Sequence, residues 1–328
     1  MPPLTHVTLG TRGSELALAQ AALTEAALAE AWPELQVART IVKTTGDLRP
    51  DLKLSEFNRG PNPVDKGIFT RELEQALQEQ RIDFAVHSLK DVPTELAAGF
   101  RIVAVLPRAP VEDVLVTKSP GGLATLPAGA LVATSSVRRA RQLRLLRPDL
   151  RVEDIRGNVP TRLTKLAHRP DLAGLLLARA GLQRLGLHAG ELPFQDTLLH
   201  QETLSADRFL PAASQGAVAF EIFGENPALE EILHRINHVQ TFLCITAERH
   251  FLHLLQAGCQ TPVGLHSALD GPALHMKTIV FSEQNPEEPP VRAEASGNAG
   301  NPHAVAERLF AQVADQTSAR RAHPAGLD

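Results

Sequence analysis

A lysine and an aspartate stand next to each other where an apolar stretch ends, in "AVHSLKDVP" (85–93). The stretch predicts a buried strand, so Ser88, Lys90 and Asp91 are expected at its carboxyl end, where open α/β sheets bind ligands. An adjacent ammonium and carboxylate suit proton transfer or the stabilisation of a developing cation. The alternative is structural: Asp91 caps a turn before Pro93, and Lys90 pairs with it.

Eight arginines crowd between residues 138 and 162 of a chain with 33 basic residues. Arg138 and Arg139 fall in the first turn of a predicted helix, where a cation opposes the helix dipole and needs another reason to be present. Arginine suits two-pronged binding of carboxylates or phosphates. Because the chain has neither a GxxxxGK[ST] loop nor a GxGxxG loop, a polycarboxylate is the expected ligand.

Other polar side chains follow predicted strands or open predicted helices, and we expect them at the same ligand-binding edge: Arg12, Thr134, Ser135, Ser136, Arg156, Asn158 and Arg162. Arg156 and Arg162 also have a structural alternative, because either can pair with Asp154 or another acid. His87 is expected on the other face of its strand, as a histidine with its hydrogen bonds satisfied inside the protein.

Cys259 is one of two cysteines and follows Gly258, the predicted C-cap of a helix over 241–256. A helix C-terminus does not lower a thiol pKa, and an ordinary thiol, with a pKa of about 8.5, is mostly protonated at neutral pH. Cys259 therefore suits one slow attachment better than rapid turnover. A buried small residue is an equally good interpretation of Cys259. Cys244, inside the helix, is expected to fill the core.

Strand-like and helix-like segments alternate through the first part of the chain, which predicts two α/β units with parallel sheets. The predicted strands are 6–11, 35–44, 82–88, 130–135, 151–157 and 173–179, with a further strand region at 209–222. From about residue 238 the pattern changes. The helix 241–256, strand-like pieces such as 273–281, a polar loop at 282–294 and a final helix at about 303–316 predict a smaller α+β domain.

Composition argues against several classes of protein. A net charge of −4 and one Trp with no Tyr argue against nucleic-acid binding. Polar residues interrupt the Ala-rich stretch 17–31, which predicts an amphipathic helix rather than a membrane span. The first residues do not read as a signal peptide, and two cysteines predict a cytoplasmic protein without disulfides. Scattered histidines, with neither HExxH nor CxxC, predict no metal site.

Several segments together resemble the porphobilinogen deaminase family, also called the hydroxymethylbilane synthases. They occur in consistent order over about residues 5–265, and "HSLKDVP", "TSSVRR" and "RGNVPTR" in combination are highly specific. Further matching segments are "GTRGSELALAQ", "KTTGD", "DKGIFTRELEQAL", "ARAGLQRLG", "LPAASQGAVAFE" and "AERHFLHLLQAGCQTPVG".

The resemblance implies an α/β fold with two periplasmic-binding-protein-like domains, an active-site cleft between them, and a small C-terminal α+β domain. In this sequence the first domain is expected over 1–110 together with 212–235. The second is expected over 111–211, and the third, which anchors the cofactor, over 236–328. A monomer is expected.

The resemblance also implies a reaction. Porphobilinogen molecules, four in all, are joined head to tail with loss of four ammonia, and hydrolytic release then gives the linear tetrapyrrole hydroxymethylbilane. The growing polypyrrole chain is built on a dipyrromethane cofactor, which a cysteine holds covalently through a thioether; Cys259 matches that cysteine. Asp91 matches the catalytic carboxylate of the family.

The resemblance assigns the remaining polar residues to the carboxylates of the pyrrole rings. The positions that match cofactor-binding residues are Ser88, Lys90, Thr134, Ser136, Arg138, Arg139 and Arg162. The positions that match substrate-binding residues are Arg12, Lys66, Arg156 and Gln215, the last near the cleft at a domain crossing.

Two residues depart from the family pattern, since Asp65 and Ser214 stand where glycine is usual. Asp65 precedes Lys66 in a loop expected to cover the cleft, where another acid would slow the binding of a polyanionic substrate. Two other functions are also considered. A carboxylate-binding module without catalysis leaves the Lys90–Asp91 pair and Cys259 unexplained, and a phosphate or nucleic-acid binder conflicts with the net negative charge.

Overall fold

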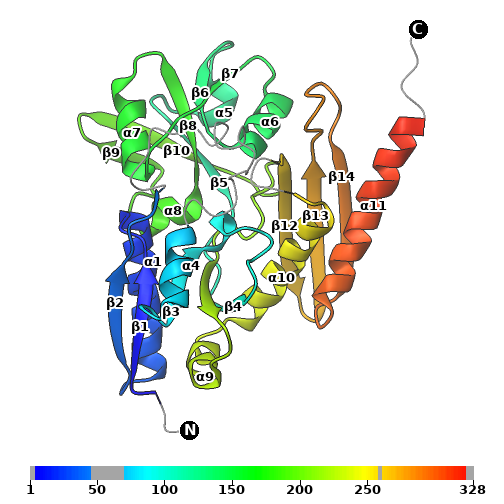
Figure 1. The fold of residues 1–328 in the computed structure, drawn as a ribbon. Helices are drawn as coiled ribbons and strands as arrows, with labels where there is room; N and C mark the ends of the chain where they lie inside the picture. Colours follow the sequence, from blue (N-terminus) through cyan, green and yellow to red (C-terminus); the bar gives the residue numbers. More distant parts are fainter. Residues whose placement is uncertain (1–3, 46–69, 258–260, 323–328) are drawn as a thin grey trace.

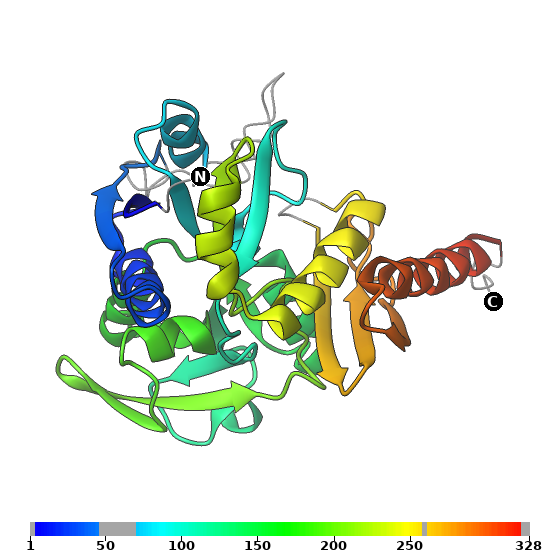
Figure 2. The same ribbon diagram turned by 90° about the horizontal axis from the view of Figure 1, so that it is seen from below.

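The computed structural model describes residues 4–45, 70–257 and 261–322, with side chains described up to residue 319. These residues form three sheets, each with its own buried apolar cluster. Figure 1 shows two α/β lobes, one above the other, and a third lobe beside them that ends in a long helix. In Figure 2 that last helix projects away from the rest of the molecule.

The first sheet has five strands, and four of them come from the start of the chain. In spatial order its strands are β2 (Gln36–Ile41), β1 (His6–Thr11), β3 (Phe84–Ser88), β11 (Val218–Phe223) and β4 (Phe100–Val105). The helices of this lobe are α1 (Glu15–Ala31), α4 (Arg71–Gln78) and α9 (Pro227–Arg235). Phe84 and Phe220 meet edge to face in its core, with ring centroids 5.8 Å apart.

The second sheet has six strands and a core rich in leucine and valine. In spatial order its strands are β7 (Arg151–Glu153), β6 (Leu131–Ala133), β8 (Leu172–Ala178), β5 (Asp113–Thr117), β10 (Thr197–Leu204) and β9 (Glu191–Phe194). Its helices are α5 (Gly122–Thr125), α6 (Val137–Leu146), α7 (Val159–His168) and α8 (Arg179–Arg184).

The third sheet is an antiparallel meander that packs against two helices. It consists of β12 (Val263–Asp270), β13 (Ala273–Val280) and β14 (Val291–Asn298), covered by α10 (Val239–Leu254) and α11 (Pro302–Ala322). Cys244 lies buried in this core, as predicted. Among the described helices, none is both long and apolar enough to cross a membrane.

The chain passes between the first two sheets twice, from β4 to β5 and from β10 back to β11. The two crossing segments touch, because Ala109 N donates to Gly216 O at 3.2 Å. A Cβ on Gly216 would lie 2.3 Å from the Ala109 carbonyl oxygen, and the φ of Gly216 is +87°, so only glycine fits here. Ser214, one of the departures from the family pattern, also adopts a left-handed φ of 59°.

Three features differ from the sequence-based expectations. The sheets are mixed rather than parallel, because the returning strand β11 runs antiparallel to β3 and β4, and β5 runs antiparallel to β8. Of the predicted strand region 209–222, the first part is the crossing segment and pairing begins at Val218. The predicted polar loop 282–294 ends early, because β14 begins at Val291, where buried and exposed residues start to alternate.

Candidate active site

Lys90 and Asp91 lie in a single turn, η1 (Leu89–Asp91), directly after β3. The Asp91 side chain is exposed, and its carboxylate makes no hydrogen bond with any other residue in the described parts of the chain. Lys90 is partly buried, and loss of hydration lowers the pKa of its ammonium group to about 8, although Asp91 opposes the shift. The turn therefore presents a carboxylate to solvent with a cation beside it.

A buried glutamine connects this turn to the second sheet. Lys90 Nζ donates to Gln215 Oε1 at 3.3 Å, and Gln215 Nε2 donates to Asp113 Oδ1 at 2.9 Å and to the Val111 carbonyl at 2.6 Å. Gln215 and Asp113 are both fully buried. Gln215 thus lies where the sequence placed it, at a crossing between the two lobes, and it links Lys90 to β5.

Arg138 and Arg139 converge on Asp113 from the first turn of α6. Arg138 Nη1 donates to Asp113 Oδ2 at 2.7 Å, while Arg139 donates to Oδ1 through Nε at 3.0 Å and Nη2 at 2.7 Å. Burial alone would raise the pKa of the Asp113 carboxyl, but the two guanidiniums hold it well below its ordinary value. Asp113 is the buried partner that the sequence did not reveal.

The other predicted residues of the second lobe lie near the N-termini of α6 and α7. Ser136 is the N-cap of α6, and its backbone N–H donates to Thr134 Oγ1 at 3.2 Å. Arg162, in α7, donates to the Gly157 carbonyl at 2.7 Å. The pKa of Arg162 is lowered to about 10, first by burial and then by the nearby charges of Arg139 and Arg156, while Asp91 opposes the shift. Asp91 of the first lobe and Arg162 of the second therefore lie close enough to interact.

Arg156 pairs with Asp154, which is the structural alternative considered from the sequence. Its Nε donates to Asp154 Oδ2 at 3.2 Å. Both side chains are partly exposed, so the pair does not prevent Arg156 from meeting a ligand. Asn158 caps α7 by accepting from Thr161 N at 2.9 Å.

The first lobe contributes its own helix N-terminus. Ser14 caps α1, and the partly buried Arg12 lies between β1 and that cap. Ser88 exchanges hydrogen bonds with Gln20 of α1, with heavy-atom distances of 2.7 and 3.1 Å. His87 points to the other face, as predicted, and its Nε2 lies 3.0 Å from the buried Glu221 carboxylate.

Two predicted residues, Lys66 and Cys259, lie outside the described residues. Gly258, the predicted C-cap of α10, lies outside them too. The left-handed residue that follows α10 is Gln256, with a φ of 53°, so the helix already terminates before Gly258. The chain that enters the Cys259 segment thus comes directly from the end of α10.

Besides Asp113, two residues of this network were not predicted from the sequence, Gln20 and Arg184. Arg184, in α8, donates to the Gly216 carbonyl at 2.6 Å, and burial lowers its pKa to about 10. Its carbonyl partner adjoins Gln215, which places this cation beside the same network. Arg184 lies in the segment "ARAGLQRLG", which matches the family, and this was the available signal. Sequence alone does not show which arginines of a helix point inward.

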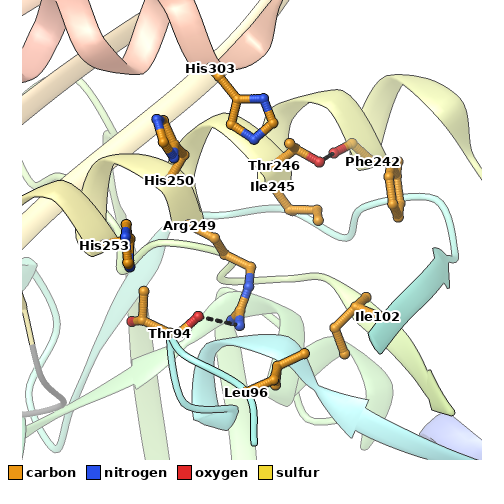
Figure 3. Close-up of a pocket in the computed structure, with 10 residues that line it drawn as sticks. All are labelled: Thr94, Leu96, Ile102, Phe242, Ile245, Thr246, Arg249, His250, His253 and His303. Atoms are coloured by element: carbon orange, nitrogen blue, oxygen red, sulfur yellow. Dashed lines mark hydrogen bonds between the residues drawn. The ribbon is translucent and has the colours of Figure 1, made fainter. Parts of the chain in front are cut away.

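A separate pocket of about 350 Å³ lies between α10 and the segment that follows Asp91. Figure 3 shows Arg249 reaching from α10 toward Thr94, with His250 and His253 on the same helix and His303 on the neighbouring α11. The residues that line this pocket do not include Lys90, Asp91 or the arginines of α6 and α7. The described residues contain no group of three or more His, Cys, Asp or Glu side chains arranged to hold a metal ion.

Two family models cover nearly all of the described chain. Residues 7–231 match the model described as "Porphobilinogen deaminase, dipyromethane cofactor binding domain", and residues 242–315 match "Porphobilinogen deaminase, C-terminal domain". The chain belongs to the porphobilinogen deaminase family. The family, the enzyme class and the dipyrromethane cofactor expected from the sequence are thereby confirmed.

Curated porphobilinogen deaminases resemble the chain over most of their length. The protein from Syntrophomonas wolfei is 42% identical over 285 residues, which is 87% of this chain and 88% of that protein. The protein from Syntrophobacter fumaroxidans is 37% identical over 315 residues, 96% of each chain. The solved structure of the methionine binding protein MetQ covers 74% of this chain and 93% of that one, with 12% identity and a TM-score of 0.40. The two lobes are defined by this chain's own sheets.

The donor set fits the dipyrromethane cofactor that the family model names. Arg138 Nε is buried and has no hydrogen-bond partner among the residues that the structure describes. The cluster of Arg138, Arg139 and Asp113 contains two guanidiniums and one carboxylate, which leaves one positive charge unbalanced within it. A group carrying carboxylates matches both features.

Proposed function

We propose that this chain joins four porphobilinogen molecules head to tail with loss of four ammonia and then releases hydroxymethylbilane by hydrolysis. One observation carries the proposal: the Lys90–Asp91 turn of the first sheet is linked through Gln215 to Asp113, where the arginines of α6 meet. An acid–cation pair thus faces a cationic cluster in a chain of the porphobilinogen deaminase family.

The cations bind and orient the carboxylates of cofactor and substrate. The residues proposed to hold the cofactor are Ser88, Lys90, Thr134, Ser136, Arg138, Arg139 and Arg162, with Cys259 as the thioether anchor. The residues proposed to bind substrate are Arg12, Lys66, Arg156 and Gln215. Arg138 and Arg139 already have a protein partner in Asp113, so they would share their remaining donor capacity with the ligand.

Asp91 performs the acid–base step. When bound, the cofactor supplies the free pyrrole α-carbon to which the first substrate unit is joined. The exposed Asp91 carboxylate accepts hydrogen bonds from pyrrole N–H groups and stabilises the positive charge that develops on the substrate as ammonia leaves. It then assists removal of the proton from the pyrrole α-carbon that has formed the new bond to the substrate. Lys90, beside it, binds a ring carboxylate and keeps the ring within reach.

The three sheets support a division of the chain into three domains. The first comprises residues 1–110 with 212–235, the second 111–211, and the third, which anchors the cofactor, 236–328. The grouping of β11 and α9 with the first lobe, despite their late position in the sequence, supports the split first domain. The enzyme acts in the cytoplasm as a monomer, with porphobilinogen and the growing polypyrrole chain as its ligands and with neither nucleic acid nor membrane as a partner.

The mass of the intact purified protein tests this function. We expect an added mass equal to two linked pyrrole units, located on the peptide that contains Cys259, either as isolated or after incubation with porphobilinogen. Loaded protein should then convert porphobilinogen to hydroxymethylbilane.

The matched control is Cys259→Ser, which replaces sulfur by oxygen and should show neither the adduct nor turnover. Wild-type protein that remains unmodified and inactive after incubation with porphobilinogen would instead favour a carboxylate-binding module without catalysis. An adduct on another residue would reject Cys259 as the anchor.

A further inference from the structure

Asp113 is the most heavily hydrogen-bonded carboxylate in the candidate site. It is the first residue of β5 and has no solvent exposure. Its Oδ2 accepts from Arg138, and its Oδ1 accepts from Arg139 and Gln215, with distances between 2.7 and 3.0 Å. A buried carboxylate with this many donors is fixed in position and stays ionised at neutral pH.

Each arginine on Asp113 is also held at a second point. Arg138 Nη1 donates to the Leu210 carbonyl at 2.7 Å, and Arg139 Nη1 donates to the Leu176 carbonyl at 3.0 Å. An unrestrained arginine side chain samples many rotamers, which a ligand would have to order on binding. Here the ordering is done by the protein itself, through one carboxylate and two backbone carbonyls.

The same carboxylate reaches the catalytic turn. Gln215 can direct its Oε1 to Lys90 because its Nε2 is held by Asp113 and by the Val111 carbonyl. Asp113 therefore fixes cations on elements of two different lobes, α6 in the second lobe and η1 in the first. A residue that served only the stability of the second lobe would have no need of this second connection.

We propose that Asp113 is a positioning residue for the dipyrromethane and porphobilinogen carboxylates: its carboxylate holds Arg138, Arg139 and, through Gln215, Lys90 in their binding arrangement before the ligand arrives. The proposal rests on the proposed function, since it takes these cations to be the carboxylate-binding groups. Asp113 touches neither cofactor nor substrate in this role. It acts through the side chains that do.

The first test is Asp113→Glu, which keeps the charge but displaces the carboxylate by one methylene. We expect cofactor-free protein of this variant to acquire the Cys259 adduct from porphobilinogen at least about tenfold more slowly than wild type, because a displacement near 1 Å is enough to misalign a binding group. Adduct formation is followed by intact mass. Acquisition at the wild-type rate would overturn the proposal.

The second test is Asp113→Asn, which removes the charge and keeps the shape. In cofactor-free protein the two guanidiniums would lose their buried anion, whereas in loaded protein the cofactor carboxylates would replace it. We therefore expect the rise in melting temperature on cofactor loading to be larger in Asp113→Asn than in wild type. An equal rise, with both forms destabilised alike, would show a merely structural role and overturn the proposal. If this variant does not fold without cofactor, the Asp113→Glu measurement decides.

The matched control is Asp171→Asn, which removes a carboxylate from an exposed pair with Arg169. It should match wild type in adduct formation and in the rise in melting temperature. The wild-type protein distinguishes a failure of the proposed function from a failure of this inference alone. If it never acquires an adduct, the proposed function fails. If it does and the Asp113 variants behave like it, this inference alone fails.

Discussion

Lys90 and the arginines are all proposed to bind carboxylates, but their charges respond differently to pH. Lys90 is an ammonium whose pKa burial has lowered to about 8, with Asp91 and Asp113 opposing the shift and Arg138 and Arg139 adding to it. Arginine keeps its proton throughout the ordinary pH range. The charge of Lys90 is therefore the part of the site most sensitive to mild alkali.

Lys90 should make cofactor acquisition pH-dependent. Below pH 8 its ammonium is charged and attracts a ring carboxylate; above pH 8 the neutral amine does not. We expect the rate at which cofactor-free protein gains the Cys259 adduct to fall as pH rises through about 8. In Lys90→Arg the guanidinium stays charged, so this fall should move to higher pH or disappear. An identical pH profile in both proteins would contradict the assignment, since the titration of porphobilinogen itself is common to both.

The sequence was sufficient to predict which residue types gather at the site, but not how they pair. Asp91, Lys90 and the α6 arginines lie near one another, as their positions after strands predicted, and Gln215 joins them at the domain crossing that the resemblance implied. Asp113 was missed because its partners lie 25 or more residues away along the chain, and because no strand was predicted where β5 begins. A buried ion pair depends on which side chains two elements turn toward each other, and periodicity does not encode that choice.

Among the elements, α10 contacts the loop that follows the Asp91 turn, and it precedes Cys259, the proposed cofactor anchor, in the sequence. Its Arg249 donates to the backbone carbonyls of Val92, Pro93 and Thr94 at 3.4, 2.6 and 3.0 Å. Figure 3 shows this side chain crossing from the helix to the loop. Burial lowers the pKa of Arg249. Burying a cation costs free energy. Among the described residues, Arg249 donates hydrogen bonds only to the carbonyls just after Asp91, so it holds that loop against the helix.

Arg249→Lys should therefore impair turnover more than cofactor binding. A lysine keeps the charge but lacks the planar fork that reaches several carbonyls at once. We expect kcat to fall by about tenfold or more through displacement of the Asp91 turn, with the Cys259 adduct still present by mass and KM little changed. The control is His253→Gln, which removes an exposed pair with Glu95 on the same face of α10 and should leave kcat unchanged. Loss of the adduct in Arg249→Lys, or an unchanged kcat, would contradict this coupling.

Helices and strands were predictable from the sequence where their hydrophobic pattern is local and periodic. The strand over 6–11 coincides with β1, the helix predicted to have Arg138 and Arg139 in its first turn is α6, and the helix predicted at 241–256 coincides closely with α10. The antiparallel insertion of β11 between β3 and β4 could not be read from the sequence. Its pairing partners lie more than a hundred residues earlier in the chain, and a buried strand has the same apolar pattern whichever direction its neighbours run.

At the scale of the whole molecule, Glu248 of α10 joins the segments that connect the three sheets. Its carboxylate is fully buried and accepts two hydrogen bonds from Arg108, on the β4–β5 crossing, at 2.7 and 3.0 Å. It also accepts from the backbone N–H of Ser214, on the β10–β11 crossing, and from Ser267 of β12. Both crossings and the third sheet are thus tied to one side chain, so its loss affects how the lobes hold together.

Glu248→Gln should destabilise the whole protein because it leaves Arg108 buried without its anion. Breaking a buried ion pair from one side costs about 3–5 kcal/mol, so we expect a clearly lower urea midpoint. Because the lost contacts join lobes rather than fill one core, the transition should also broaden or split, with the third lobe separating from the other two. Glu153→Gln, at an exposed pair with Arg169, should shift the midpoint by no more than about 1 kcal/mol in equivalent stability. If Glu248→Gln unfolds at the wild-type urea concentration and in one transition, other contacts hold the lobes together.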